Sequence, residues 1–422
     1  MRVYGLLFLM FFLGVAHGSA QQTYFTDVNS NLIKSLQVKV ADELISSPYI
    51  ELEGDEQIQI NFDVLEQGIE RYCYSIVHCD ASWQKSILSP IQYMSGFQGL
   101  TIDDYATSIS TTTGYTNYNL LLPNDDIRFK VSGNYAVRIY KEDAPERILL
   151  TACFSVVEPR VELSASVSGN TDIDTNLSHQ QVSFSINTKN FSIPYPQTDL
   201  KVFVYQNNRR DNTVSGIQPT SISDNKITYS NNRSLIFPAG NEYRRTEFLS
   251  TKYNGMHVEH VSFHNPYYNV ELTTDLERSN QTYQYDQDQD GRFFIRCSSC
   301  DNPETEADYF IVHFALECEP LLNGSIYLSG DLFHNVLDEK SKMGYNFETK
   351  RYEKAVLLKQ GSYNYQYLFV PSGSHVGETG PTEGDYYQAE NEYTICVYYR
   401  PMGAQYDRLI GLTTIQNVMQ VL

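Results

Sequence analysis

The 422-residue sequence has a single tryptophan and little positive charge: 31 Lys and Arg residues stand against 51 Asp and Glu, so the formal charge is −20 at pH 7. A surface this acidic repels a phosphate backbone, which argues against nucleic acid as a partner. After residue 20 no apolar run approaches the roughly 18 residues that a membrane helix needs. Hydrophobic residues still make up 41% of the chain, which argues against global disorder.

The first 20 residues have the pattern of a secretory signal peptide. Arg2 is followed by the apolar run 6–15 and by small residues up to Ala20, which predicts cleavage after Ala20. Because Gln21 and not a cysteine follows this point, no lipid anchor is predicted. We therefore expect an exported protein without a membrane-spanning helix.

Tyrosine is abundant, with 33 copies, and it takes part in a pattern typical of β-strands. In residues 357–370, LLKQGSYNYQYLFV, a glycine precedes three tyrosines that alternate with polar residues. This period of two predicts a strand with one buried face and one solvated face. Similar stretches stand at 133–139 and 291–295, and we interpret each of the three as the closing strand of its own β-sandwich.

Polar turn signals divide the chain into three strand-rich blocks, with junctions at Glu158-Pro159 and at residues 301–306. We therefore predict an all-β protein of three immunoglobulin-like or early-set-type antiparallel β-sandwich domains in series. Their predicted limits are residues 21–157, 158–305 and 306–422.

Two connections are too long to be simple turns. Residues 81–114 are predicted to include a short helical turn, and to pack over a sheet or meet a partner. Residues 372–391 are rich in glycine, proline and acidic residues, which predicts a mobile surface loop.

The seven cysteines are an odd number for an exported protein. Cys297 and Cys300 begin a spacing that continues at His313 and Cys318 and is similar to that of a zinc finger. The last two residues, however, fall in an alternating strand and face opposite ways, so we predict no zinc site. A local disulfide between Cys297 and Cys300 stays open as another interpretation.

Three further groups have the composition of chemical sites. Residues 286–291, DQDQDG, resemble a calcium loop, but a cysteine stands where the bidentate Glu is needed. His78 and Cys79 are adjacent in a predicted strand, so they point to opposite faces and cannot act as base and nucleophile. His260 and His264 would lie about 13 Å apart. We predict no catalytic residue, no metal site and no cofactor.

The third block resembles the glycogen-binding-type sandwich modules, starting from residues 326–333, IYLSGDLF. Those modules stack sugars on tryptophan, whereas this block has none and places Val336 and Leu337 near the expected position. An exported carbohydrate-binding β-sandwich protein is the alternative function that we retain. An integral outer-membrane barrel is a weaker one, because its strands need apolar outward faces about 10 residues long.

Seven short motifs occur in one order between about residues 36 and 411. They are Tyr74-x3-His78-Cys79-Asp80-Ala81-x-Trp83, Ser132-Gly133-Asn134-Tyr135, Gln206-Asn207-x-Arg209-x-Asp211, Ala239-Gly240-Asn241-Glu242-Tyr243-Arg244, Glu306-Ala307-Asp308-Tyr309, Lys359-Gln360-Gly361-x-Tyr363-x-Tyr365 and Asn391-Glu392-Tyr393. In this order they resemble the Plug protein family of the type IX secretion system.

The resemblance implies an all-β, non-catalytic periplasmic protein that needs no cofactor. It would lie at the inner side of the outer membrane without spanning it, bind the translocon barrel protein and close its periplasmic mouth. Polar interfaces release more easily than apolar ones, which suits a removable seal. We predict partner contacts in two polar clusters, with turn formation as the competing interpretation: Asn207, Arg209, Asn241, Glu242, Tyr243 and Arg244.

Overall fold

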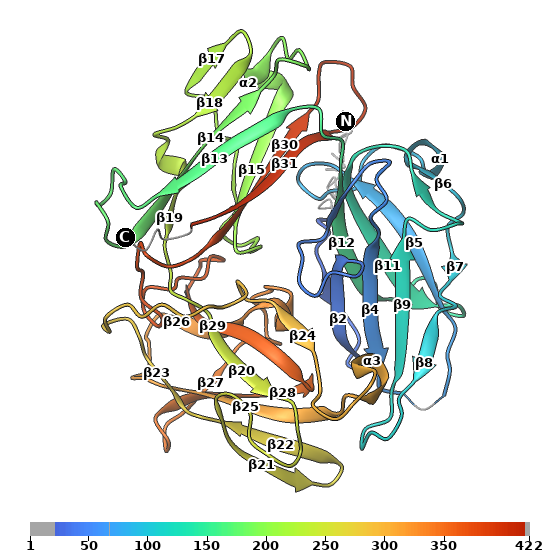
Figure 1. The fold of residues 1–422 in the computed structure, drawn as a ribbon, viewed down its shortest axis with the longest axis vertical. Helices are drawn as coiled ribbons and strands as arrows, with labels where there is room; N and C mark the ends of the chain where they lie inside the picture. Colours follow the sequence, from blue (N-terminus) through green and yellow to red (C-terminus); the bar gives the residue numbers. More distant parts are fainter. Residues whose placement is uncertain (1–21, 67, 418–422) are drawn as a thin grey trace, which may run out of the picture.

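The computed structural model describes residues 22–66 and 68–417, so the predicted signal peptide lies outside the described residues. Its regular structure is almost entirely β, in mostly antiparallel sheets that pack face to face, which confirms the predicted all-β sandwich architecture. Figure 1 shows three groups of strands placed around a common centre. We name them the N-terminal unit (residues 22–157), the middle unit (161–238 with 392–416) and the C-terminal unit (244–371).

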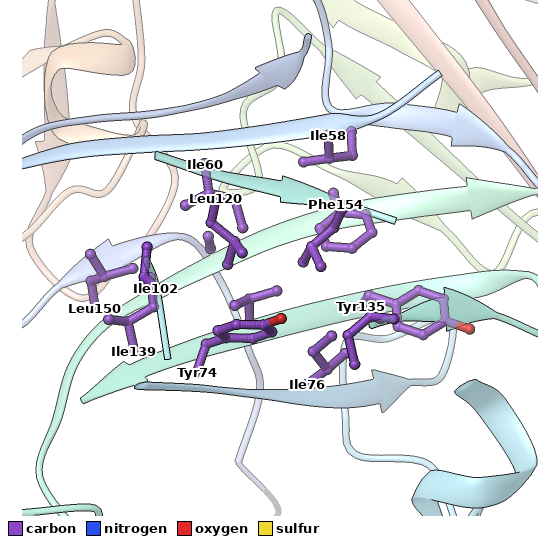
Figure 2. Close-up of a cluster of buried hydrophobic side chains, with 14 of the residues drawn as sticks. Ile58, Ile60, Tyr74, Ile76, Ile102, Leu120, Tyr135, Ile139, Leu150 and Phe154 are labelled. Atoms are coloured by element: carbon purple, nitrogen blue, oxygen red, sulfur yellow. The ribbon is translucent and has the colours of Figure 1, made fainter. Parts of the chain in front are cut away.

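The N-terminal unit packs two sheets against each other. Its elements are β1 (Asp27–Val28), β2 (Ile33–Val40), β3 (Tyr49–Glu51), β4 (Ile58–Val64), β5 (Tyr72–Cys79), α1 (Pro90–Tyr93), β6 (Met94–Ser95), β7 (Leu100–Thr101), β8 (Tyr105–Thr107), β9 (Thr116–Leu122), β10 (Arg128–Phe129), β11 (Gly133–Lys141) and β12 (Ile148–Val157). One sheet has the order β1-β12-β11-β5-β7, and the other β2-β4-β9-β8. Ile58 and Ile60 of one sheet and Tyr74, Ile76 and Tyr135 of the other are among the buried residues between them (Figure 2).

The middle unit takes two of its strands from the end of the chain. Its elements are β13 (Glu162–Ser168), β14 (His179–Asn187), α2 (Pro196–Asp199), β15 (Leu200–Gln206), β16 (Val214–Ser215), β17 (Ser221–Ser223), β18 (Lys226–Tyr229), the 3-10 turn η1 (Arg233–Leu235), β19 (Ile236–Pro238), β30 (Glu392–Tyr399) and β31 (Arg408–Gln416). β15 pairs with β30 from Leu200 opposite Tyr399 to Gln206 opposite Tyr393. Their apolar faces cover β14 and β18 in one core.

The C-terminal unit likewise combines strands from both sides of residue 305. Its elements are β20 (Arg244–Phe248), β21 (Val258–His264), β22 (Tyr267–Leu272), β23 (Asp275–Leu276), β24 (Phe293–Ile295), α3 (Pro303–Glu306), β25 (Tyr309–Glu317), β26 (Gly324–Ser329), the 3-10 turn η2 (Asp331–Phe333), β27 (Gly344–Asn346), β28 (Arg351–Lys359) and β29 (Gly361–Pro371). β20, β24 and β26 all pair with β29, and β22 pairs with β25.

The sheets therefore do not separate at the predicted junction of residues 301–306. β20 to β24 precede it but pair with later strands, while β30 and β31 follow it but pair with β15. Strands pair where this buries their apolar faces, and the strands with matching apolar faces lie far apart along the chain. The division into folding domains stays a prediction.

The tyrosine-rich strand β29 confirms half of its prediction. Tyr363, Tyr365 and Tyr367 are buried on one face, as expected. Asn364 and Gln366 were expected to face water, and this is wrong because they are only 0% and 3% exposed. A second layer of chain covers them: the Gln289 amide donates to Asn364, and Gln366 donates to Tyr243.

The interpretation of three separate closing strands is also wrong. β24 carries the stretch at 291–295 and pairs directly with β29, with Phe293 opposite Tyr363. Two of the three similar stretches are thus neighbours in one sheet. The third, β11, is the central strand of its sheet in the N-terminal unit.

The two long connections differ from each other. The predicted helical turn in residues 81–114 is α1, which buries Tyr93 and lets its hydroxyl donate to the carbonyl of Ile76 at 2.7 Å. The prediction of a surface loop at 372–391 is wrong, because Gly377, Thr382 and Glu383 of this segment are buried. Among the described residues, no helix is long and apolar enough to cross a membrane.

Replacing Ile395 by alanine tests the contribution of the chain end to the middle unit. Ile395 is fully buried on β30, so the cavity left by truncation should lower the free energy of unfolding by about 2–5 kcal/mol, measured by urea denaturation. Ile222→Ala on the edge strand β17, where the side chain is half exposed, is the matched control and should change it by less than about 1 kcal/mol. Equal small effects would contradict the shared core.

Candidate functional site: polar joints between the units

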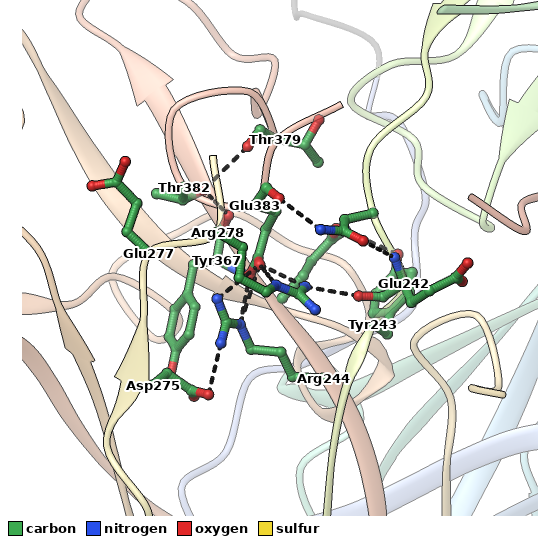
Figure 3. Close-up of polar contacts among 12 residues, drawn as sticks. Glu242, Tyr243, Arg244, Asp275, Glu277, Arg278, Tyr367, Thr379, Thr382 and Glu383 are labelled. Carbon is green, nitrogen blue, oxygen red and sulfur yellow. Dashed lines mark hydrogen bonds and ion pairs between the residues drawn. The ribbon is translucent and has the colours of Figure 1, made fainter. Parts of the chain in front are cut away.

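A buried carboxylate, Glu383, organises an extended polar cluster (Figure 3). Arg244 of β20 and Arg278, which follows β23, both point their guanidinium groups at it, with closest N–O distances of 2.9 and 2.6 Å. The backbone amide of Tyr367 donates to the same carboxylate at 2.8 Å. The segment after β29 is thereby fixed to two other strands of the C-terminal unit.

Asp275 extends this cluster on the other side of Arg244. Its carboxylate accepts from Arg244 at 2.8 Å, from the hydroxyls of Tyr365 and Tyr367 at 2.9 and 2.7 Å, and lies 3.1 Å from His257. The tyrosines of β29 thus serve two roles, since their rings fill the core while their hydroxyls satisfy a buried charge. This is the arrangement that a buried ion pair needs to offset its loss of hydration.

The charges in this cluster favour ionised carboxylates. Burial alone would raise the pKa of Glu383, but Arg244 and Arg278 outweigh it and the net pKa is lowered. The pKa of Asp275 is lowered in the same way, mainly by Arg244 and His257 against the effect of burial. Both groups therefore stabilise the fold above their unfolded pKa, and this contribution is lost as the pH falls through their folded pKa.

A second joint connects the N-terminal and C-terminal units. Asp63 of β4 is fully buried, and its carboxylate accepts from the Lys359 ammonium and from the Tyr309 hydroxyl, each at 2.6 Å. Asn117 of β9 donates to the other carboxylate oxygen at 2.8 Å. The Lys359 ammonium also lies 4.2 Å from the centre of the Tyr115 ring, a cation–π contact.

This second joint differs in its electrostatics. Burial raises the pKa of Asp63 in spite of Lys359, and burial lowers the pKa of Lys359 in spite of Asp63. Desolvation thus opposes charge on both partners, which makes the pair costly to break on one side only.

A third joint brings all three units together. Arg292, just before β24, donates to Glu392 of β30 at 2.5 Å and to the Ser47 hydroxyl of the N-terminal unit at 2.9 Å. The acids Asp288 and Asp290 lie on the same segment, and burial raises the pKa of each to about 7. Repulsion from Asp288 and Glu392 adds to the shift of Asp290, and repulsion from Glu242 and Asp286 adds to that of Asp288, so this region carries more buried negative charge than its cations neutralise.

The residues predicted as partner contacts in the first cluster face the interior. Asn207 and Arg209 are about 5% exposed or less. The Asn207 side chain donates to Asn391 at 2.7 Å and accepts from the Glu392 amide at 2.8 Å. Arg209 donates to Asp211 at 2.6 Å and to the Gly377 carbonyl at 2.7 Å. In this conformation they hold β30 and the segment after β29 in place.

The second cluster is also internal. Asn241 donates to the Glu383 carbonyl at 2.8 Å, Glu242 accepts from the Glu390 amide at 3.2 Å, and Tyr243 accepts from Gln366. Arg244 is the cation of the Glu383 cluster. Direct contact between these residues and a partner would require the surrounding loops to open, and it stays a prediction.

The chemical-looking motifs have structural partners. Cys297 and Cys300 are joined as a disulfide, with Cα atoms 5.7 Å apart. His78 is buried between the Ser86 hydroxyl at 2.8 Å and the Ser132 carbonyl at 3.2 Å, and burial lowers its pKa to about 4. Within residues 22–66 and 68–417, no group of three or more His, Cys, Asp or Glu is placed to hold a metal ion.

The calcium-like loop at 286–291 is an ordinary turn with internal donors. Asp288 accepts from the backbone amides of Tyr243 and Asp290, and Gly291 has a positive φ, +83°. Its carboxylates thus face protein groups, and the positively charged Arg292 lies 3.7 Å from Asp290.

Sequence analysis missed the joint residues themselves. Asp63 and Lys359 are 296 positions apart, and no local pattern connects them. The available signal was a single charge inside an apolar strand: Asp63 follows Phe62 in β4, and Lys359 follows Leu358 in β28. Such a charged side chain is buried only when a group of opposite charge or a hydrogen-bonding group pairs with it. Each of the two residues therefore indicated a pairing group elsewhere in the chain.

Comparison with known proteins gives both a family match and matches among solved structures. Residues 33–158, which include β2 to β12, match the family model described as type 9 secretion system plug protein, first domain. A crystal structure of a hypothetical protein from Parabacteroides merdae shares 74% sequence identity with this chain and superposes with a TM-score of 0.93. That alignment covers 94% of this chain and 100% of the other chain. Curated proteins gave no significant match.

A double-mutant cycle tests the second joint. Lys359→Met should lower the free energy of unfolding by about 3–5 kcal/mol, because it leaves Asp63 buried without its cation. Adding Asp63→Asn should recover part of the loss, so the two effects should fall short of their sum by more than about 1 kcal/mol in urea denaturation. Lys226→Met, at an exposed lysine, is the control. Additive effects of the two substitutions would show that the pair is not coupled.

The raised pKa of Asp290 at the third joint predicts that a substitution there changes the stability of the fold by an amount that depends on pH. The unfolded chain releases this proton near its ordinary pKa of about 4 and the folded chain near pH 7, so the contribution of the protonated acid to stability is lost as the pH rises between them. Asp290→Asn should therefore stabilise the protein at pH 8 by on the order of 1–3 kcal/mol and leave it unchanged near pH 4.

Asparagine also tolerates the positive φ of this position, +51°. Asp286→Asn, at a half-exposed side chain on the same turn, is the control and should have no such pH dependence. Thermal unfolding at both pH values measures the difference, and a stabilisation by Asp290→Asn that is equal at both would contradict the assignment.

Proposed function

The chain belongs to the plug protein family of the type IX secretion system, and from this premise we propose that it is a periplasmic, non-catalytic protein that binds the translocon barrel and seals its periplasmic mouth. The observation that carries the proposal is the family match of the N-terminal unit over residues 33–158. The likeness to the Parabacteroides merdae protein extends the same fold over the other two units.

Rigidity supports this proposal in physical terms. A stopper must keep its shape against a pore. The joints at Asp63 and Arg292 fix the units to one another by buried charged hydrogen bonds, and the Glu383 cluster fixes the segment after β29 to the C-terminal unit. Breaking one of them exposes or strands a buried charge, which costs several kcal/mol. The units therefore resist independent movement on thermal energy alone.

An exposed apolar patch supports the proposed binding. Ile87, Ile91 and Phe97, on the connection that carries α1, are 75%, 77% and 80% exposed. A hydrogen bond of 3.3 Å from Gln92 to Gln405 places this connection beside the turn at 401–405. Neighbouring exposed apolar side chains mark protein interfaces more often than chance exposure does. We propose that this apolar patch, rather than a polar cluster alone, meets the barrel.

Carbohydrate binding has less support. Sugar-binding sandwich modules present an open aromatic ring, whereas the single tryptophan, Trp83, lies in the N-terminal unit under the Arg210 guanidinium at 4.2 Å. In the C-terminal unit, the tyrosines of β29 face the core. No specific observation therefore favours a sugar platform.

An affinity capture from detergent-solubilised outer membranes tests the proposal. The tagged protein should recover a very large barrel protein, and Ile91→Asp with Phe97→Asp should reduce this recovery roughly tenfold or more, because charge is introduced into an apolar contact. Leu322→Asp, which alters an equally exposed leucine of the C-terminal unit, is the control and should not.

Two results would contradict the proposal at different levels. If the double variant recovers the barrel protein unchanged, the apolar patch is not the contact surface, although the barrel protein is still the partner. Recovery of glycans without any barrel protein by the unaltered chain would remove the plug function itself and favour the carbohydrate-binding alternative.

A further inference from the structure

A cavity of about 420 Å³ lies where the three units meet. The N-terminal unit contributes β2 and the connection from β2 to β3, the middle unit contributes β15, β30 and β31, and the C-terminal unit contributes η2 and the residues before β24. Cavities of this size, mostly apolar and with few polar groups, are typical of small-molecule sites.

The walls of the cavity are largely apolar. Its lining includes Phe25, Val38, Ile45, Phe293 and Leu412. An apolar chain that enters this cavity is removed from water and contacts apolar side chains instead. This burial favours binding by roughly 0.8 kcal/mol for each methylene group.

The lining also includes two cations, Lys39 and Arg210. Lys39 donates to the carbonyl of Glu43 at 2.6 Å, and Arg210 donates to the carbonyl of Tyr24 at 2.6 Å while stacking on Trp83. In the described part of the chain, neither forms an ion pair with a carboxylate, although the protein as a whole carries a charge of −20. Two such cations beside an apolar cavity complement an anion.

The lining also includes Arg292, Asp331 and His334. Arg292 is paired with Glu392 at 2.5 Å, and Asp331 accepts from Asn335 at 3.0 Å. Burial holds the pKa of His334 at about 4, so its ring is neutral at pH 7. Among the charged side chains of the lining, the cations Lys39, Arg210 and Arg292 thus outnumber the one carboxylate, Asp331.

We propose that this cavity binds a small amphipathic anion, an unbranched apolar chain of roughly eight to twelve carbons that ends in a carboxylate. The chain lies among the apolar walls, and the carboxylate faces Lys39 and Arg210. Because the ligand touches all three units, its binding stabilises their arrangement. This inference is independent of the proposed plug function, since it concerns the purified protein alone.

Isothermal titration calorimetry with decanoate, below its aggregation concentration, tests the inference on the full mature chain. Decanoate should bind at one equivalent, and octanoate should bind roughly tenfold more weakly because it lacks two methylene groups. Decyltrimethylammonium, which has the same chain and the opposite charge, should show no saturable binding.

Two variants locate the site. Lys39→Gln and Arg210→Gln, each checked for an unchanged melting temperature, should weaken decanoate at least fivefold, while Lys226→Gln, remote from the cavity, should not. If a variant fails to fold, Val38→Phe, which narrows the cavity without touching a cation, should weaken the longer chain more than the shorter one. Absence of saturable binding, equal binding of the cationic surfactant, or equal affinity of all variants would each overturn the proposal.

A short apolar peptide with an amidated C-terminus is the final comparison. Binding of this peptide in place of decanoate would overturn the proposal and make the cavity a peptide site. Binding of decanoate with no peptide competition supports it.

Discussion

The fold depends on buried charges that are paired and hydrogen-bonded inside the protein. Glu383 has almost no contact with water, yet two guanidinium groups and one backbone amide meet its carboxylate. Buried charge is the most expensive group to place in a protein interior, and it is tolerated only under such complete pairing. Apolar packing makes each unit compact, but these polar contacts decide how the units and their loops are placed relative to one another.

The three joints are not equivalent. In the Glu383 cluster, the attraction of the nearby cations outweighs the effect of burial, so the pKa values of Glu383 and Asp275 are lowered. The Asp63 pair is balanced against desolvation, and the joint at Arg292 has surplus acid, since Asp288 and Asp290 hold protons up to about pH 7. Acidification therefore weakens the first cluster while relieving repulsion in the third, and the arrangement of the units responds to pH in two opposing ways.

Local patterns in the sequence predict where strands lie much better than they predict which strands pair. The period-two alternation identifies β29 and the buried row of Tyr363, Tyr365 and Tyr367. It cannot tell whether the polar face meets water or another layer of chain, and Asn364 and Gln366 meet Tyr243 and Gln289. The same limit explains why β24 and β29 were predicted to lie in different sandwiches. Strands pair so that their apolar faces are buried, and the local sequence of a strand does not show which partner buries it.

The candidate site follows the same rule. Sequence order and seven motifs were sufficient to indicate the family, and one motif residue, Arg244, is a cation of the Glu383 cluster. Arg209 and Arg244 were predicted to contact a partner because polar interfaces suit a removable seal. The groups that they meet inside the protein, the Gly377 carbonyl and the Glu383 carboxylate, lie in a segment whose composition predicted a mobile loop.

The position of β30 and β31 has a consequence for how the protein matures. A chain that emerges N-terminus first presents β13 to β19 long before the two strands that complete their sandwich, which arrive only with residues 392–416. Until then β15 has one open edge and an uncovered apolar face, a state that invites wrong pairing. Closure of the middle unit therefore waits for residues 392–416, and a chain that stops before them leaves β15 without its partner strand.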